Sequence, residues 1–142
     1  MYGMTKAVPA QEFSRVPEKF RKNRKSSWGD ANAAGMELDA FLEGPSFDRA
    51  GNLYVTDIPF GRVFRVSPGG DWTLITEYDG WPNGLKVQPD GVLVAADYRH
   101  GLVRIDPATG AASAVLQTVM SEGFKGLNDL HFTSNGDLYF TD

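Results

Sequence analysis

Three stretches of this sequence align without a gap: EGPSFDRAGNLYVTD at residues 43–57, NGLKVQPDGVLVAAD at 83–97 and NDLHFTSNGDLYFTD at 128–142. Each stretch opens on a polar residue, carries a glycine and a leucine at shared positions in its second half, and ends on aspartate. Their first residues, at 43, 83 and 128, lie 40 and 45 residues apart. A repeat of this length that contains several short strand patterns is typical of the blades of a β-propeller.

The residues around each repeat predict a four-stranded antiparallel meander. In the second unit, apolar or alternating runs too short for helices fall at 85–88, 92–96, 102–105 and 112–117. Turn-forming residues such as Pro89-Asp90-Gly91 separate them. The sequence therefore predicts an all-β fold, a fragment of a β-propeller with about two and a half blades: blade 1 at about 43–78, blade 2 at about 83–118 and the inner half of blade 3 at about 128–142.

We expect two segments of different character, an N-terminal leader at 1–39 and an incomplete propeller domain at 40–142. The leader contains the basic run Phe20-Arg21-Lys22-Asn23-Arg24-Lys25. Such a run is either a tether for an anionic surface or a solvated leader, and we favour the solvated leader. A propeller needs about four or more blades to close. The chain is therefore expected to need the C-terminal half of a propeller, or self-association, to cover its open strand edges.

Composition excludes several classes of partner. The net charge is −4 and no repeat carries a clustered basic face, which argues against nucleic acid. The chain has no cysteine, so disulfides and thiolate metal sites are excluded. No apolar run is long enough to span a membrane, and the first ten residues lack the apolar core of a signal peptide. We therefore expect a cytoplasmic protein without a membrane partner.

The residues that open the three repeats are the candidates for chemistry. Equivalent residues of successive blades are related by rotation about the central axis, so Glu43, Asn83 and Asn128 are expected to converge at one end of the channel. One carboxylate and two amide carbonyls form a hard-oxygen site suited to Ca²⁺, Mg²⁺ or Mn²⁺. Taken singly, each of these residues is more typical of a turn or of a solvated charge.

The same residues carry a family resemblance. The stretches Leu42–Phe47, Trp81–Leu85 and Gly126–Leu130, each followed by a hairpin with a shared glycine, resemble the SMP-30/gluconolactonase/LRE family over roughly residues 38–142. The resemblance implies the N-terminal half of a six-bladed propeller. It also implies that Glu43 and Asn128 bind a divalent metal ion, with Ca²⁺ preferred over Mg²⁺, Mn²⁺ or Zn²⁺, and that Asn83 contacts the substrate.

The resemblance further implies a metal-dependent lactonase that hydrolyses sugar lactones. The family's general base is an aspartate of a later blade, and no catalytic residue of this chain corresponds to it. Asp129 is either a carboxylate that orients a metal ligand or a residue that bonds the local backbone at the start of a strand. Two other functions stay open: a non-catalytic binding or scaffold propeller, and an inactive truncated fragment.

Several other residues are less promising. Trp81 and Tyr98 either line the channel mouth or, as we prefer, pack within a blade. Two histidines, His100 and His131, are too few for a histidine zinc centre. For the aspartates that end the three repeats we favour a role in turns over a role in a site: Asp57, Asp97 and Asp142.

Overall fold

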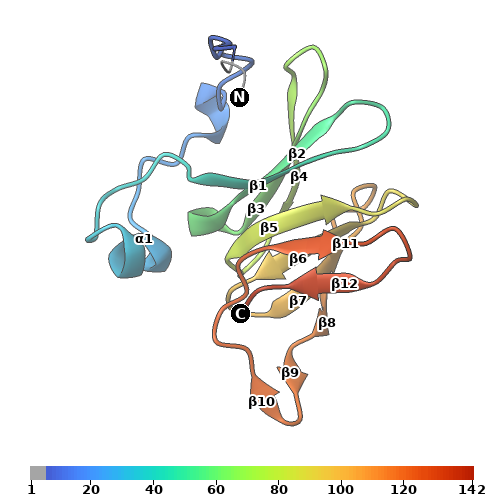
Figure 1. Ribbon diagram of the computed structural model, residues 1–142. Coiled ribbons are helices and arrows are strands. Elements are labelled where there is room, and N and C mark those ends of the chain that lie inside the picture. The colour runs from blue at the N-terminus through green and yellow to red at the C-terminus, as the bar shows by residue number, and fades with distance from the viewer. Residues whose placement is uncertain (1–5) are drawn as a thin grey trace.

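The computed structural model describes residues 6–142 and consists mainly of antiparallel strands (Figure 1). Blade 1 is a four-stranded sheet with the strands in sequence order: β1 (Leu42–Phe47), β2 (Leu53–Asp57), β3 (Arg62–Val66) and β4 (Trp72–Glu77). Blade 2 repeats this meander: β5 (Pro82–Val87), β6 (Leu93–Asp97), β7 (Gly101–Ile105) and β8 (Ala112–Leu116). The all-β fold predicted from the repeat is confirmed.

The third unit contains the two strands that the sequence predicts, β11 (Leu130–Phe132) and β12 (Leu138–Phe140). Before them, β9 (Thr118–Val119) and β10 (Glu122–Gly123) form a short hairpin that the repeat does not predict. Figure 1 shows β1, β5 and β11 side by side, each as the first strand of its unit. This is the arrangement of adjacent propeller blades, in a set that is not closed into a ring.

The shared glycine of the three repeats explains their hairpins. Gly51, Gly91 and Gly136 have φ angles of 82°, 88° and 92°. These values lie in the region that residues with a Cβ rarely adopt, so the glycine fixes the turn between the first two strands of each unit. The repeat in the sequence is therefore a repeat of backbone conformation.

Two apolar clusters join the three units. The first lies between blades 1 and 2 and contains these buried residues: Tyr54, Val63, Leu85, Leu93, Ala95, Val103 and Ile105. The second lies between blade 2 and the third unit and contains these buried residues: Val94, Ala96, Leu102, Leu127 and Leu130. Alternate residues of β6 point to opposite faces, so blade 2 contributes to both clusters. Burial between successive sheets holds the inner strands in place.

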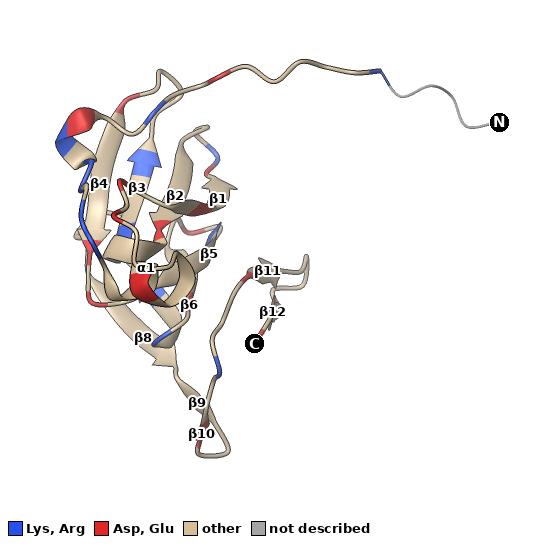
Figure 2. Cartoon of the chain, turned by 90° about the vertical axis from the view of Figure 1, so that its left-hand side faces the viewer, with Lys and Arg blue, Asp and Glu red and all other residues tan. Residues whose placement is uncertain are grey.

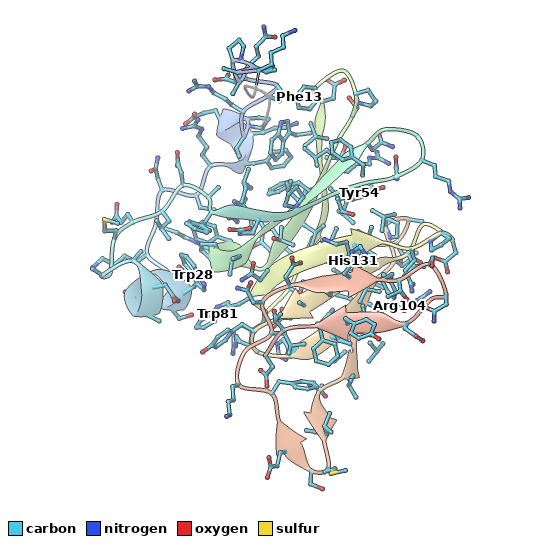
Figure 3. All side chains as sticks on the ribbon, viewed as in Figure 1. Phe13, Trp28, Tyr54, Trp81, Arg104 and His131 are labelled. Carbon is cyan, nitrogen blue, oxygen red and sulfur yellow. The ribbon has the colours of Figure 1, made fainter. Side chains whose placement is uncertain are left out.

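The N-terminal segment lies against blade 1. It contains a 3₁₀ turn, η1 (Glu18–Phe20), and one helix, α1 (Ser27–Asn32). The ring of Phe20 contacts that of Phe64 with centroids 5.1 Å apart, and Arg62 Nη1 donates a hydrogen bond of 2.6 Å to the carbonyl oxygen of Phe20. Trp28, labelled in Figure 3, contacts Phe41 at a centroid distance of 4.8 Å. Many residues here are solvated, as expected of a leader, but these aromatic contacts anchor the segment.

The basic run takes part in this docking. Arg24 and Leu38 form an isolated antiparallel bridge, and Lys22 Nζ lies 3.2 Å from a carboxylate oxygen of Glu77. The division of the chain between residues 39 and 40 stays a prediction. Within residues 6–142, no helix has the length and apolarity needed to cross a membrane.

Candidate metal and substrate site

The three residues that open the repeats meet at one cavity. Glu43 lies on β1, Asn83 on β5, and Asn128 two residues before β11. All three line a cavity of about 200 Å³ together with Asp129 and Lys86. The expectation that equivalent blade positions converge is met by this geometry.

Irregular strand pairing at the cavity turns these side chains toward it. In β1 the pairing with β2 shifts between Glu43 and Ser46, and in β5 the pairing with β6 shifts between Pro82 and Leu85. Strict alternation would place residues 83 and 85 on one face. The shift instead leaves Leu85 fully buried in the core while Asn83 and Lys86 line the cavity. Such bulges re-aim side chains and are frequent beside functional sites.

Hydrogen bonds to their backbone carbonyl oxygens tie the two asparagines to neighbouring units. Thr56 Oγ1, from blade 1, donates a hydrogen bond of 2.7 Å to the carbonyl oxygen of Asn83. The N–H of Gly84 donates one of 2.7 Å to the carbonyl oxygen of Asn128. The first bond joins β5 to blade 1 and the second joins β5 to the third unit, so the cavity is held from both sides.

Two glycines permit the close approach of the inner strands. A Cβ added at Gly44 would lie 2.4 Å from the carbonyl oxygen of Asn83, and one added at Gly84 would lie 2.4 Å from Asp129 Oδ1. Real Cβ atoms do not approach other atoms so closely. Each glycine directly follows a candidate ligand, Glu43 or Asn83. The ligand supplies the polar side chain, and the glycine, which has no Cβ, lets the neighbouring strand pack closely beside it.

Asp129 bonds its local backbone, as one of its two interpretations predicts. Its Oδ1 accepts a hydrogen bond of 2.8 Å from the N–H of Leu130, and its own N–H donates one of 3.1 Å to Thr141 Oγ1. Lys86 Nζ lies 3.7 Å from Asp129 Oδ1. The carboxylate therefore lines the cavity and also accepts a hydrogen bond from the first residue of β11. Its role toward a metal ligand stays a prediction.

Sequence reasoning missed Lys86. A signal was present, because Lys86 stands three residues after Asn83 and is the one charged residue of β5. In Figure 2, β5 lies beside β1 and β11; Glu43 belongs to β1, Lys86 belongs to β5, and Asp129 directly precedes β11. The cavity thus contains one ammonium group beside two carboxylates.

The donors of the cavity suit a hard cation. Glu43 offers a carboxylate, while Asn83 and Asn128 offer amide oxygens. Residues 6–142 contain no group of three or more His, Cys, Asp or Glu side chains placed to hold a metal ion. A site here would therefore rely on amide oxygens, with Glu43 as its charged ligand.

The remaining candidates lie outside this cavity's lining. Trp81 and Tyr98 contact each other with ring centroids 5.5 Å apart, which fits packing within a blade. His100, in the turn between β6 and β7, has its Nε2 2.5 Å from the carbonyl oxygen of Asp79. His131 is an exposed residue of β11.

The repeated aspartates take part in turn and loop chemistry. Asp57 accepts a hydrogen bond from the N–H of Phe41, and Asp97 accepts bonds from the N–H groups of Arg99 and His100. Asp142 accepts bonds from two consecutive backbone N–H groups just before β11, those of Lys125 and Gly126. The interpretation of these aspartates as local structural residues agrees with the geometry.

Comparison with known proteins identifies the class. Residues 41–142 match the SMP-30/Gluconolactonase/LRE-like region, and the chain belongs to this family. It is 30% identical over 115 residues to a gluconolactonase of Zymomonas mobilis, a match that covers 70% of this chain and 32% of that protein. It is 32% identical over 118 residues to the adipocyte plasma membrane-associated protein of Gallus gallus, with 71% of this chain and 28% of that protein covered.

A solved structure supports the fold. A gluconolactonase from Xanthomonas campestris superimposes with a TM-score of 0.67 at 25% identity, covering 72% of this chain and 35% of that one. The chain therefore spans about a third of the length of the relatives that it matches.

Proposed function

We propose that this chain supplies the N-terminal part of the active site of a divalent-metal-dependent lactonase that acts on sugar lactones. The observation that carries the proposal is the meeting of Glu43, Asn83 and Asn128 at one cavity. Membership in a family whose relatives include gluconolactonases supports it. A cavity lined by one Glu, one Asp and two Asn side chains is consistent with a hard cation and a polyhydroxylated ligand.

The proposed roles follow from the donor atoms. Glu43 and Asn128 would hold the cation, with Ca²⁺ the first choice and Mg²⁺, Mn²⁺ or Zn²⁺ as alternatives. A bound cation of this kind polarises a carbonyl group and lowers the pKa of a coordinated water. Asn83, whose backbone is held by Thr56, would orient the lactone by hydrogen bonds. Asp129 would support Asn128 from the adjacent position.

We place the general base, a carboxylate that accepts the proton of the attacking water, outside residues 1–142. Further blades, from a longer polypeptide or from self-association, would supply it. The other partner is the lactone itself, with neither nucleic acid nor a membrane, and we propose the cytoplasm as the location. Lack of a general base typically lowers the rate by about 10²- to 10⁴-fold, so the 142-residue chain is expected to hydrolyse lactones very slowly.

The test combines cation titration with a hydrolysis assay. Calorimetric titration with Ca²⁺ and Mn²⁺ is expected to show weak binding that Glu43→Gln lowers at least about tenfold, because a charged ligand is lost without a change of shape. Glu122→Gln is the matched control, since Glu122 is an exposed residue of β10 outside the cavity. If Glu43→Gln and Glu122→Gln changed the cation affinity equally, Glu43 would not be a ligand of the site. Rapid metal-dependent lactone hydrolysis by this chain would show that the site needs no further blade.

A second candidate is a non-catalytic binding propeller. The observation that favours it is Lys86, since an ammonium group in the cavity opposes a neighbouring cation. If the wild-type chain bound neither Ca²⁺ nor Mn²⁺, this candidate would be favoured over the metal-dependent enzyme.

A further inference from the structure

Lys86 is a charged residue in the lining of the candidate site to which the proposed function assigns no role. Its side chain is 28% exposed, so most of its stem is covered, and its ammonium group borders the cavity that Glu43, Asn83 and Asn128 line. The shifted pairing of β5 is what gives Lys86 and Asn83 access to the same space. The position of the charge therefore follows from the fold of the inner strand.

The contact between Lys86 and Asp129 leaves the ammonium group available. The distance of 3.7 Å is longer than a hydrogen bond, and the Asp129 oxygen involved already accepts the N–H of Leu130 at 2.8 Å. Asp129 is 62% exposed, and exposed ion pairs of this kind contribute little to stability. Among residues 6–142, the charged contact of Lys86 Nζ is this one with Asp129, so the three N–H donors of the ammonium group can serve a ligand.

A cation cannot be the partner of this group. An ammonium group offers no lone pair, and its charge lowers the affinity of the surrounding oxygens for a metal ion. The chemistry that does match it is an anionic oxygen of a carboxylate or a phosphate, to which lysine donates charge-assisted hydrogen bonds. Asn83 lies on the same strand and can bond the hydroxyl groups of the same ligand.

We propose that Lys86 makes this site selective for polyhydroxylated ligands that carry an anionic group, so that the substrate class is an acidic sugar lactone. The inference rests on the proposed lactone site and narrows its substrate. Glu43 and Asn128 would serve the reacting end of the ligand, and Lys86 would bind the charged substituent. Lys86 is thus a specificity residue in the wall of the cavity.

The test uses two probes that differ in one charged group, glucitol 6-phosphate and glucitol. The ¹H–¹⁵N NMR spectrum of the 142-residue protein is followed during titration with each, since this method detects weak binding and locates it by residue. Glucitol 6-phosphate is expected to shift the backbone amides of Asn83, Lys86 and Asp129, with an affinity at least about tenfold above that of glucitol. Lys86→Met is expected to abolish this preference, because it keeps the length of the stem and removes the charge.

Two further variants make the result specific. Lys86→Arg is expected to retain the preference for the phosphate. Lys125→Met changes an exposed lysine outside the cavity and is expected to leave both titrations unchanged. An equal affinity of the wild-type protein for the two probes, no binding of the phosphate, or equal losses in Lys86→Met and Lys125→Met would each overturn the inference.

The same measurements separate this inference from the proposed function. Calorimetric titration of the wild-type protein with Ca²⁺ tests the cation site, and the two NMR titrations test Lys86. Failure of the wild-type protein to bind a cation, with the phosphate preference intact, would count against the metal-dependent lactonase alone. Normal cation binding with no phosphate preference would count against the role of Lys86 alone.

Discussion

Blade 1 and blade 2 place an aspartate at the same position, the end of the second strand, but stabilise it with different donors. In blade 1 the fully buried Asp57 forms an ion pair with Arg62, which is only 1% exposed, at 2.5 Å. In blade 2 the fully buried Asp97 accepts a hydrogen bond of 2.9 Å from the hydroxyl of Tyr78, which comes from the end of blade 1. A blade with another blade before it can use that neighbour as a donor.

No blade precedes blade 1 among the described residues, and the N-terminal segment packs against it instead. Arg62 bonds Asp57 on one side and the carbonyl oxygen of Phe20 on the other, and its guanidinium lies over the rings of Phe60 and Phe64. Burial raises the pKa of Asp57, although the N–H of Phe41 and the guanidinium of Arg62 act in the opposite direction. Burial likewise raises the pKa of Tyr78, and the nearby Asp97 carboxylate adds to the effect. The comparison shows that a charged side chain joins the segment to blade 1, whereas a neutral hydroxyl joins blade 1 to blade 2.

The largest expected effect comes from removing the charged donor. Arg62→Met is expected to lower the free energy of unfolding by about 3–5 kcal/mol, because it leaves the buried carboxylate of Asp57 without its partner. Urea unfolding followed by circular dichroism measures the change. The double variant Asp57→Asn/Arg62→Met is expected to recover part of the loss, since it removes both charges.

An exposed ion pair between the N-terminal segment and blade 1 serves as the control for the buried ion pair. Lys22→Met breaks a pair with Glu77 whose side chains are 27% and 40% exposed, and its effect is expected to stay below about 1 kcal/mol. A loss for Arg62→Met no larger than that for Lys22→Met would refute the proposed importance of the buried ion pair.

A smaller effect is expected from the neutral donor of blade 2. Tyr78→Phe removes one hydrogen bond to the Asp97 carboxylate and is expected to cost about 1–3 kcal/mol. Asp97 keeps the N–H groups of Arg99 and His100, so the loss should remain below that of Arg62→Met. The same urea titration compares the two variants, and a reversed order would contradict the distinction between the blades.

The smallest effect concerns the contact that holds the site. Thr56→Val is expected to cost about 0.5–1.5 kcal/mol, because it removes the hydrogen bond to the carbonyl oxygen of Asn83 while nearly keeping the volume. Blade 2 has Ala96 at the corresponding position, and so lacks this hydroxyl. Hydrogen exchange of the β5 amides should accelerate in Thr56→Val and remain slow in Thr56→Ser, which retains the donor. Equal exchange in both variants would show that the hydroxyl does not secure β5.

The repeat made the strands, their order and the meeting of Glu43, Asn83 and Asn128 predictable. Each of these depends on local periodicity, turn residues and rotation between equivalent positions. Contacts with no counterpart in the repeat were not predictable. The docking of Phe20 and Trp28 on blade 1 depends on long-range packing of a segment without a repeat of its own. The sequence marks Lys86 as the charged residue of β5, but its access to the cavity depends on a shift in strand pairing that the alternation of β5 does not reveal.

The two glycines that follow Glu43 and Asn83 also determine how regular the assembly can be. Gly44 and Gly84 each permit the next inner strand to approach closely, but the third repeat has Asp129 at this position. A Cβ here excludes an identical approach by any strand placed beside β11. The three inner strands are therefore not equivalent at this position: the first two leave room for a closely packed neighbour, whereas the third carries a carboxylate side chain there.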